Sequence, residues 1–526
     1  SRCKSAKVPR VNPVVFRGGR MDIHDQSEAI AFLSTPGTYG ETGAVKVIET
    51  HISLVFLIDG RAYKLKRAVK LPYVDFSTYD LRLYYCRREV ELNARATPDL
   101  YRGIRRITRE ADGRLVFDGA GEAIDVVVEM NRFAQHDLFD RMASEGRIDA
   151  ALMRRTAEMI AGVHASAPVV HDGSGSANMA GVLDINEAGF ATSHVFEPNA
   201  VTALTDAFRR AWAERAERMD RREREDKVRL CHGDLHLRNL FMSPAGPRMF
   251  DCIDFNDQIA TVDVLYDLAF LLMDLWHRGL AEFANVVANR YLDISRDDDG
   301  FALLPFFMAV RAAVRAHVSA TQIEEGADAG MALTHSAKAY FTFAGSLLGD
   351  RSPRLVAIGG LSGSGKSTLA DALAPRLSGP PGARILESDR IRKAMFGVAP
   401  EARLPVEAYR PDVSRSVYAE LTERAKLILS DGGTVLVDAV FDREDDRNRV
   451  QSIAETLGVP FTGLWLDADA QLLATRVRTR PQGTSDATLE VLQMQLARDL
   501  GSMRWQRIDT GRPMEEIQAD VDALLR

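Results

Sequence analysis

The stretch "RLVAIGGLSGSGKSTLA", residues 354–370, decides the fold of the C-terminal part of the chain. Its first residues form an apolar run typical of a buried strand, glycines and serines follow, and a helical pattern begins at its end. The middle has the spacing G-x-x-x-x-G-K-[ST] at residues 360–367. In such a turn, backbone N–H groups curl round phosphate oxygens and the helix N-terminus adds its positive dipole end. The stretch therefore predicts a phosphate-binding loop between a strand and a helix.

The side chains of this loop have predicted roles in nucleotide binding. We expect Lys366 to reach the β- and γ-phosphates and Ser367 to ligate Mg²⁺. The nucleotide is ATP or, as an alternative, GTP. The residues expected to surround the phosphates are Gly360, Ser362, Gly363, Ser364, Gly365, Lys366, Ser367 and Thr368.

Strands and helices alternate after the loop. The runs "ARILESD", "TVLVDAVF", "FTGLWLD" and "WQRID" each predict a strand, and a helical pattern follows each one. This alternation predicts an α/β domain with a parallel sheet of about five strands. Gly, Asp, Ser and Pro cluster at residues 345–354, so we expect the domain to occupy residues 350–526.

A second loop, "LCHGDLHLRNLF" at residues 230–241, is dense in polar side chains. It holds Asp234 and Asn239, and Asp254 follows fifteen residues after Asn239. Phosphoryl transfer uses such a set: one aspartate accepts or orients the proton of the acceptor hydroxyl, while an asparagine and a second aspartate hold Mg²⁺ through oxygen atoms. The alternative is that Asp234 and Asn239 only cap a turn.

The chain before and around this loop has a two-part pattern. Alternating apolar runs at 44–50 and 52–67 predict antiparallel strands with a turn at Asp59-Gly60, a helix is expected around 77–95, and three more strands follow. From about 137 to 345 the pattern is mainly helical. The order predicts a small sheet lobe at about 40–133 and a helical lobe at about 134–349.

The segments "HGDLHLRN" and "CIDF" resemble the catalytic loop and the metal-binding segment of the aminoglycoside phosphotransferase and choline kinase families, which are relatives of protein kinases. The resemblance implies a bilobal α+β protein-kinase-like fold for residues 21–349. It also implies that Asp234 is the catalytic base and that Asn239 and Asp254 are metal ligands. His232 would brace the loop.

The same resemblance implies an ion pair upstream. "AYK" at residues 62–64 is similar to the family's A-x-K, which implies that Lys64 contacts the α- and β-phosphates. Lys66 lies on the same face of the predicted strand and is the alternative. Glu89 in "CRREVELN" would pair with the lysine, with Glu91 as the alternative.

"VVVEMNRF" at residues 126–133 resembles the hinge between the lobes of these families. The resemblance implies that backbone groups from Glu129 to Asn131 meet the adenine. The chain departs from the kinase pattern between its first strands, where "ETHISLVF" contains no G-x-G-x-x-G. Contacts of the sheet lobe with phosphates must therefore be made differently.

In the C-terminal part, "SD-x-x-R" within "ILESDRIRKAMFG" resembles gluconate-kinase-like, zeta-toxin-like and polynucleotide kinases. The resemblance implies that Asp389 activates the acceptor hydroxyl and that Arg392 orients the acceptor. Asp438 would steer Mg²⁺ through water, and Arg476 and Arg480 would cover the transferring phosphates. The alternatives are that Asp389 is a helix N-cap and that the arginines form a solvated face.

The whole chain resembles a bacterial family in which an aminoglycoside-phosphotransferase-like domain is fused to a P-loop kinase domain. The resemblance implies a tandem ATP-dependent kinase that phosphorylates hydroxyl groups of a small molecule, such as a sugar, an amino-sugar or another alcohol. One alternative is a kinase of nucleic-acid 5′-hydroxyl groups in the C-terminal domain. Another is a nucleotide-gated regulator with an N-terminal pseudokinase.

The composition narrows these possibilities. Of 526 residues, 46% are hydrophobic and 27% charged, and the net charge of −7 disfavours a nucleic-acid partner. The four cysteines form no C-x-x-C pair, which fits a reducing cytoplasm. Charged residues or prolines interrupt the most apolar stretches, 264–276 and 301–320, so we expect core helices and no membrane span. Residues 1–20 carry six Arg or Lys and no acid, and we expect them to be a leader or arm outside the fold.

Overall fold

The computed structural model describes residues 24–50, 52–71, 74–173, 175–324, 330–349, 351–479 and 485–525. The chain divides into two compact units. The first contains the residues up to Glu91 together with Asp99–Arg132, and the second contains Leu92–Pro98 and the chain from Phe133 onwards. The leader expected at residues 1–20 lies outside the described residues, as does Arg480, one of the two arginines expected to cover the transferring phosphates.

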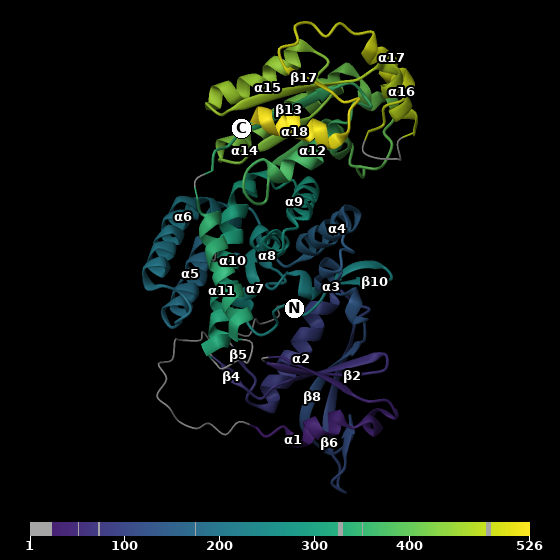
Figure 1. Ribbon diagram of the computed structural model, residues 1–526. Helices are drawn as coiled ribbons and strands as arrows, with labels where there is room; N and C mark the ends of the chain where they lie inside the picture. Colours follow the sequence, from purple (N-terminus) through teal and green to yellow (C-terminus); the bar gives the residue numbers. More distant parts are fainter. Residues whose placement is uncertain are drawn as a thin grey trace, which may run out of the picture. The chain divides into compact units, whose positions relative to one another are not determined.

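The first unit is an antiparallel sheet with helices on it (Figure 1). Its elements are α1 (Ser27–Ser34), β1 (Lys46–Glu49), β2 (Ser53–Ile58), β3 (Arg61–Lys66), β4 (Lys70–Leu71), β5 (Val74–Asp75), α2 (Tyr79–Ala94), β6 (Tyr101–Arg109), β7 (Leu115–Phe117) and β8 (Glu122–Asn131). The main sheet has the order β1-β2-β3-β8-β6-β7. Successive side chains of a strand point to opposite faces, so Tyr63 and Leu65 pack in the core with α1 while Lys64 and Lys66 reach Glu89 on α2.

The second unit begins with a mainly helical part. Its helices are α3 (Phe139–Ser144), α4 (Ala150–Ser166), α5 (Gly175–Ala191), α6 (Pro198–Arg224), α7 (Asp257–Ala260), α8 (Val264–His277), α9 (Ala281–Ser295), α10 (Leu304–Glu324) and α11 (Gly330–Leu347). Four short strands pair as β9 (Val228–Leu230) with β12 (Thr261–Asp263) and β10 (Leu240–Ser243) with β11 (Gly246–Met249). The polar loop predicted at 230–241 therefore lies between β9 and β10.

Helix α10 belongs to the longest apolar stretch of this part. Asp298–Glu324 is the one helical stretch, among the residues that the structure describes, whose length and hydropathy would let it cross a membrane. In the structure 72% of the apolar 18-residue part of this stretch is buried, and α10 packs against α8 and α11. It is a core helix, as the sequence predicted.

The remainder of the second unit is the predicted α/β domain. Its strands are β13 (Leu355–Gly360), β14 (Arg384–Glu387), β15 (Val435–Asp438), β16 (Phe461–Asp467) and β17 (Gln506–Asp509). Its helices are α12 (Lys366–Leu373), α13 (Ser388–Met395), α14 (Pro411–Ser430), α15 (Glu444–Leu457), α16 (Ala470–Thr479), α17 (Leu489–Leu496) and α18 (Met514–Leu525). The five strands are parallel, in the order β14-β15-β13-β16-β17, which confirms the predicted fold class.

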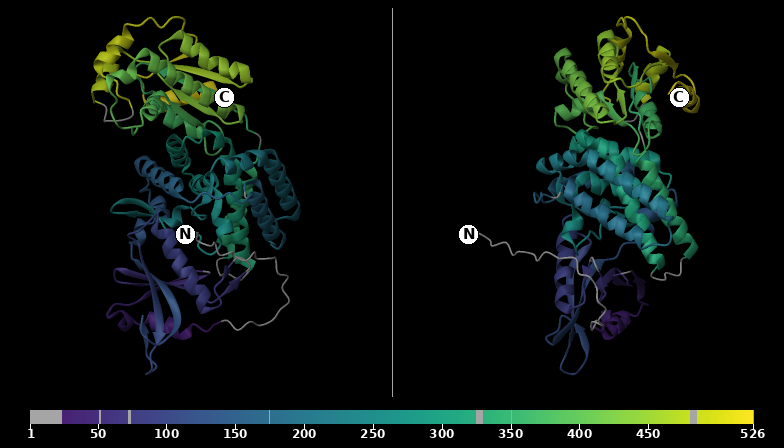
Figure 2. Two further views of the ribbon diagram at one scale, coloured as in Figure 1. Left: turned by 180° about the vertical axis from the view of Figure 1, so that it is seen from behind. Right: turned by 90° about the vertical axis from the view of Figure 1, so that its left-hand side faces the viewer.

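Helices cover both faces of this sheet (Figure 2). Val356 and Ile358 on β13 belong to the core that contains residues of α12 and α18. Leu355 and Ala357, which alternate with them, belong to the core that contains residues of α14 and α15. The alternation explains why β13 is apolar throughout, since a strand buried on both faces has no polar side.

Candidate active sites

The glycine-rich loop lies at the carboxyl end of β13, the central strand of the parallel sheet. Lys366 opens α12, and its Nζ donates to the carbonyl oxygens of Gly360 (2.9 Å) and Leu361 (3.2 Å). Gly363 has a φ of +84°, and a Cβ at this position would lie 2.8 Å from the carbonyl oxygen of Leu473. The loop therefore needs glycine at 363 for both its backbone conformation and its packing.

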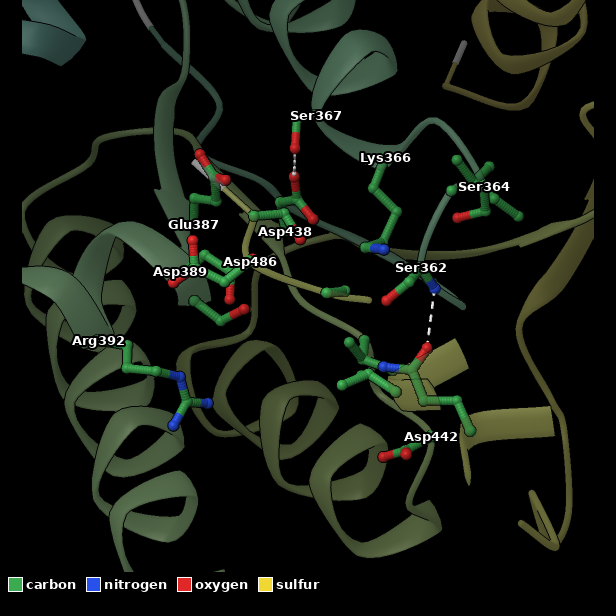
Figure 3. Close-up of a pocket in the computed structure, with 18 of the residues that line it drawn as sticks. Ser362, Ser364, Lys366, Ser367, Glu387, Asp389, Arg392, Asp438, Asp442 and Asp486 are labelled. Carbon is green, nitrogen blue, oxygen red and sulfur yellow. Dashed lines mark hydrogen bonds between the residues drawn. The ribbon is translucent and has the colours of Figure 1, made fainter. Parts of the chain in front are cut away.

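Carboxyl side chains gather beside Lys366 (Figure 3). Glu387 and Asp438 end neighbouring strands and are partners in the register of β14 with β15. The Ser367 hydroxyl donates to Asp438 Oδ2 at 2.8 Å. Burial raises the pKa of Asp438 to about 7, with Lys366 opposing the change and Glu387 and Asp389 adding to it. A hydroxyl and a carboxylate this close suit Mg²⁺, which prefers oxygen ligands.

Asp389 and Arg392 lie on α13 and line the same cavity as the glycine-rich loop. Asp389 is in the first turn of the helix, after the N-cap residue Glu387, so the alternative reading of Asp389 as a helix N-cap is wrong. Burial and the neighbouring Glu387 raise the pKa of Asp389, against the effect of Arg392. The Arg392 side chain donates to the Ala408 carbonyl oxygen at 2.7 Å and lies over the ring of Tyr409.

The predicted lid residue Arg476 also lines this cavity. Its Nη2 donates to the carbonyl oxygen of Thr510 at 2.7 Å, so its guanidinium is held at the rim by the backbone that follows β17. Arg480, its predicted companion, lies outside the described residues. One cavity of about 1220 Å³ is therefore bordered by the glycine-rich loop, by three carboxyl side chains and by two arginines: Glu387, Asp389, Asp438, Arg392 and Arg476.

The polar loop of the helical part brings Asp234 and Asn239 together. Asn239 Nδ2 donates to the backbone oxygen of Asp234 and to its Oδ2, both at 2.9 Å. The Asp234 side chain is 38% exposed. Partial burial opposes ionisation, but His236, with Nε2 3.4 Å from Asp234 Oδ2, outweighs it and the pKa of Asp234 is lowered. Asp234 is therefore ionised near neutral pH.

Backbone hydrogen bonds tie the segment of Asp254 to this loop. Phe250 N–H donates to the Asn239 carbonyl oxygen at 3.1 Å, and Ile253 N–H donates to the His232 carbonyl oxygen at 2.9 Å. Asp254 follows directly and is 4% exposed. His232 Nε2 donates to the Phe250 carbonyl oxygen at 2.9 Å, which is the bracing role expected for His232.

Two buried carboxylates that the sequence did not single out hold the loop in place. Asp267 on α8 accepts from the N–H groups of His232 (3.2 Å) and Gly233 (2.8 Å). About two helical turns further along, Asp274 accepts from Leu237 N–H at 3.1 Å. The sequence showed both only as charges within the apolar run "VLYDLAFLLMDLW". A charge in a buried helix is costly unless it is paired. An aspartate within an apolar run therefore indicates that its carboxylate has a buried partner.

In the first unit, Glu89 binds both candidate lysines. Glu89 Oε1 accepts from Lys64 Nζ at 2.9 Å, and Oε2 accepts from Lys66 Nζ at 2.7 Å. Lys66 is 2% exposed and Lys64 14%, so Lys64 is the more accessible of the two. Glu91 lies on the exposed side of the same helix.

The predicted hinge residues lie at the end of β8. Glu129 forms ion pairs with Arg61, Arg102 and Arg105. The Asn131 N–H donates to the Leu100 carbonyl oxygen at 2.8 Å, so this N–H is already used within the sheet. An adenine contact in this region would therefore have to use other backbone groups of β8.

The regions that contain the two loops each match a known protein family. Residues 116–304 match the phosphotransferase enzyme family, and residues 355–499 match an AAA domain. Uncharacterized proteins of Mycobacterium tuberculosis and Mycobacterium bovis are 26% identical over 480 residues, which is 90% of this chain and 93% of theirs.

Solved structures resemble each part separately. A choline/ethanolamine kinase family protein of Mesorhizobium loti is similar over 62% of this chain and 95% of its own, with 15% identity and a TM-score of 0.40. A gluconokinase of Sinorhizobium meliloti is similar over 34% of this chain and 93% of its own, with 25% identity and a TM-score of 0.24.

The phosphotransferase match over residues 116–304 covers the polar loop, and the AAA match over residues 355–499 covers the glycine-rich loop, so both halves contain domains that support a phosphotransferase. More particularly, a domain that matches the phosphotransferase enzyme family is joined to a C-terminal P-loop domain with a five-stranded parallel sheet. The resemblance stated from the sequence for each half is confirmed. Domains of these types use ATP and usually Mg²⁺.

Proposed function

We propose that the P-loop domain is an ATP-dependent kinase that phosphorylates a hydroxyl group of a small molecule. The observation that carries this proposal is the single cavity of about 1220 Å³ bordered by Lys366 and Ser367 on one side and by Asp389 and Arg392 on the other. A nucleotide on the loop and an acceptor beside Asp389 would share this space. The cavity is large enough for both a nucleotide and a small alcohol.

The residues divide the chemistry between them. The acceptor oxygen forms a bond to the γ-phosphorus, the bond from that phosphorus to the β,γ-bridging oxygen breaks, and the hydroxyl proton passes to Asp389. Because its pKa is raised, Asp389 is a stronger base than an exposed aspartate. Lys366 and Arg476 would face the phosphates. Ser367 and Asp438 would hold Mg²⁺, which would neutralise phosphate charge.

We further propose a second transfer site in the N-terminal domain. There Asp234 accepts the hydroxyl proton, and Asn239 and Asp254 would hold Mg²⁺. In the first unit, Lys64, positioned by Glu89, is the residue that the resemblance assigns to the α- and β-phosphates. The contacts of Asn239 with Asp234 and of Glu89 with Lys64 support these roles. The acceptor is a sugar, an amino-sugar or another alcohol, and the two sites act on one compound or on successive products.

The test follows phosphorylated products by mass in the full chain, with a panel of sugars, amino alcohols, nucleosides and a 5′-hydroxyl oligonucleotide. Two sites predict that Asp234→Asn removes one phosphorylation and Lys366→Ala removes the other. Asp112→Asn, an exposed change in the turn between β6 and β7, is the control and should lose neither. If the second step needs the first product, that product is supplied directly. ATP binding without transfer to any acceptor would instead favour the nucleotide-gated regulator.

A further inference from the structure

The edge strand of the parallel sheet, β14, is covered by helix α9 of the helical part. Because β14 ends the strand order, one side of its backbone has no neighbouring strand. There the side chain of Asn289 takes the place of a strand. Its Oδ1 accepts from Ile385 N–H at 2.7 Å, and its Nδ2 donates to the Ala383 carbonyl oxygen at 3.2 Å. One amide thus reproduces the donor and acceptor pattern of a paired backbone.

One turn further along α9, Asp293 holds two arginines of the P-loop domain. Its Oδ1 pairs with Arg384 Nη2 at 2.7 Å, and its Oδ2 pairs with Arg390 Nη1 at 3.0 Å. Arg384 opens β14, whereas Arg390 lies in the first turn of α13. Arg390 also pairs with Glu387 at 2.6 Å. A single carboxylate of the helical part therefore binds both ends of the segment that carries Glu387 and Asp389.

Burial makes these contacts specific. Arg384 is fully buried and Asp293 is 12% exposed, and Arg384 also pairs with Asp298 of the helical part at 2.7 Å. Asn289 is 3% exposed. The contacts lie within a continuous apolar core that includes residues of both α9 and the sheet. The geometry of this junction is consequently fixed by charged and amide groups, which are more directional than apolar packing.

Covering an edge strand prevents it from pairing with other chains. Because β14 leads directly into α13, the contacts of α9 with β14 also affect the position of Asp389. The distance along the chain from the last residue of β14 to Asp389 is two residues. A shift of β14 therefore moves Asp389 relative to Lys366, which opens α12 after the strand β13. A displacement of about 1 Å between reacting groups can slow a transfer by about a hundredfold.

We propose that Asn289 and Asp293 are positioning residues of the P-loop site. Helix α9 lies inside the region that matches the phosphotransferase enzyme family, yet it fixes the acceptor side of the second domain's site. The inference rests on the proposed function of the P-loop domain. It makes the helical part a component of that site, and not only the carrier of another one.

The test uses the full chain with Asp234→Asn, so that ATP consumption reports the P-loop site. The turnover number and the KM for Mg·ATP are measured, with water as the acceptor if the panel has given no other. The KM reports affinity at the P-loop, because the N-terminal site of this protein can bind Mg·ATP but does not consume it. Asp293→Asn and Asn289→Ala should each lower the turnover number by about tenfold to a hundredfold. The affinity for Mg·ATP should stay within about twofold, because β13, the loop and α12 are not touched. Hydrogen exchange at Ile385 N–H should become faster in Asn289→Ala.

Two further variants separate positioning from general stability. Arg218→Gln removes the ion pair of α6 with Asp431, which follows α14; this pair joins the same two parts without touching β14 or α12, so the change should alter neither quantity. Asn289→Asp keeps the oxygen that accepts from Ile385 and Arg384 and should recover part of the lost turnover.

Unchanged turnover in folded Asp293→Asn and Asn289→Ala would overturn the inference. The inference would also be overturned if lower Mg·ATP affinity and a lower melting temperature accounted for the whole loss of turnover, and if Asn289→Asp recovered none of it. Full turnover in Asp389→Asn is a different outcome, since it would refute the proposed role of Asp389 and hence the function on which the inference rests.

Discussion

Replacing Glu89 by glutamine removes the charge that joins β3 to α2 in the first unit. Glu89 is 1% exposed, and burial opposes its ionisation, but Lys64 and Lys66 outweigh burial and lower its pKa from 4.5 to about 2. A difference of this size corresponds to about 3 kcal/mol of stability at neutral pH. Because the folded-state pKa is the lower one, this contribution is complete above the unfolded-state value of 4.5 and is lost as the pH falls toward 2. At pH 3.5, about 1.4 kcal/mol of it should be gone.

The assay must report on the first unit alone. All four tryptophans lie in the second unit, the first being Trp212, so tryptophan fluorescence does not serve. Amide hydrogen exchange of β3 and α2, followed by mass spectrometry at one pH in both proteins, gives the difference in opening free energy because the intrinsic rates cancel. We expect Glu89→Gln to open more easily by about 3 kcal/mol at pH 7, and the difference to be about 1.4 kcal/mol smaller at pH 3.5.

The control is Arg87→Gln, an exposed change on the same helix, which should alter the opening free energy by less than about 0.5 kcal/mol. A Glu89→Gln difference of equal size at both pH values would show that the ionised carboxylate does not stabilise the unit.

Three other outcomes follow from the structure. Gly363→Ala places a Cβ 2.8 Å from the Leu473 carbonyl oxygen at a φ of +84°, so the KM for Mg·ATP at the P-loop, measured by ATP consumption in Asp234→Asn protein, should rise by about tenfold or more; an unchanged KM would contradict the loop geometry. Asp389 must be ionised to act as a base and its pKa is raised, so turnover at the P-loop site should fall as the pH drops through a pKa above the ordinary aspartate value. A fall in turnover only at or below the ordinary aspartate pKa would argue against Asp389 as the base. Asp267→Asn removes the anion that accepts from two loop N–H groups, so transfer in the N-terminal domain should slow by about tenfold or more while Lys366-dependent transfer persists; equal losses at both sites would point to general unfolding.

The element order was predictable from the sequence because it depends on local pattern. The strand, glycine turn and helix at residues 354–370 follow from residues next to one another, as does the Asp59-Gly60 turn, where Asp59 has a φ of +44°. The same holds for the polar loop, whose Asp234 and Asn239 are five residues apart and bond directly. Short-range spacing sets these contacts, so a single sequence shows them.

The supports of the two candidate sites were not predictable in this way. Asp267 bonds to Gly233, 34 residues before it, and Asn289 bonds to Ile385, 96 residues after it. Nothing in the spacing of a buried aspartate or asparagine says which distant N–H group it will meet. Glu387 was missed for a related reason, since its place beside Asp438 depends on the pairing of β14 with β15.

The cover of β14 by α9 has a consequence for biosynthesis. Translation proceeds from the N-terminus, and α9 ends roughly ninety residues before β14 begins. The helical part can therefore be folded, with Asn289 and Asp293 in place, when the edge strand emerges from the ribosome. A protein whose synthesis started near residue 350 would expose the free side of β14 and the uncompensated charge of Arg384. Exposed strand edges pair with one another, so such a fragment should self-associate, and co-expression of the helical part should suppress the association.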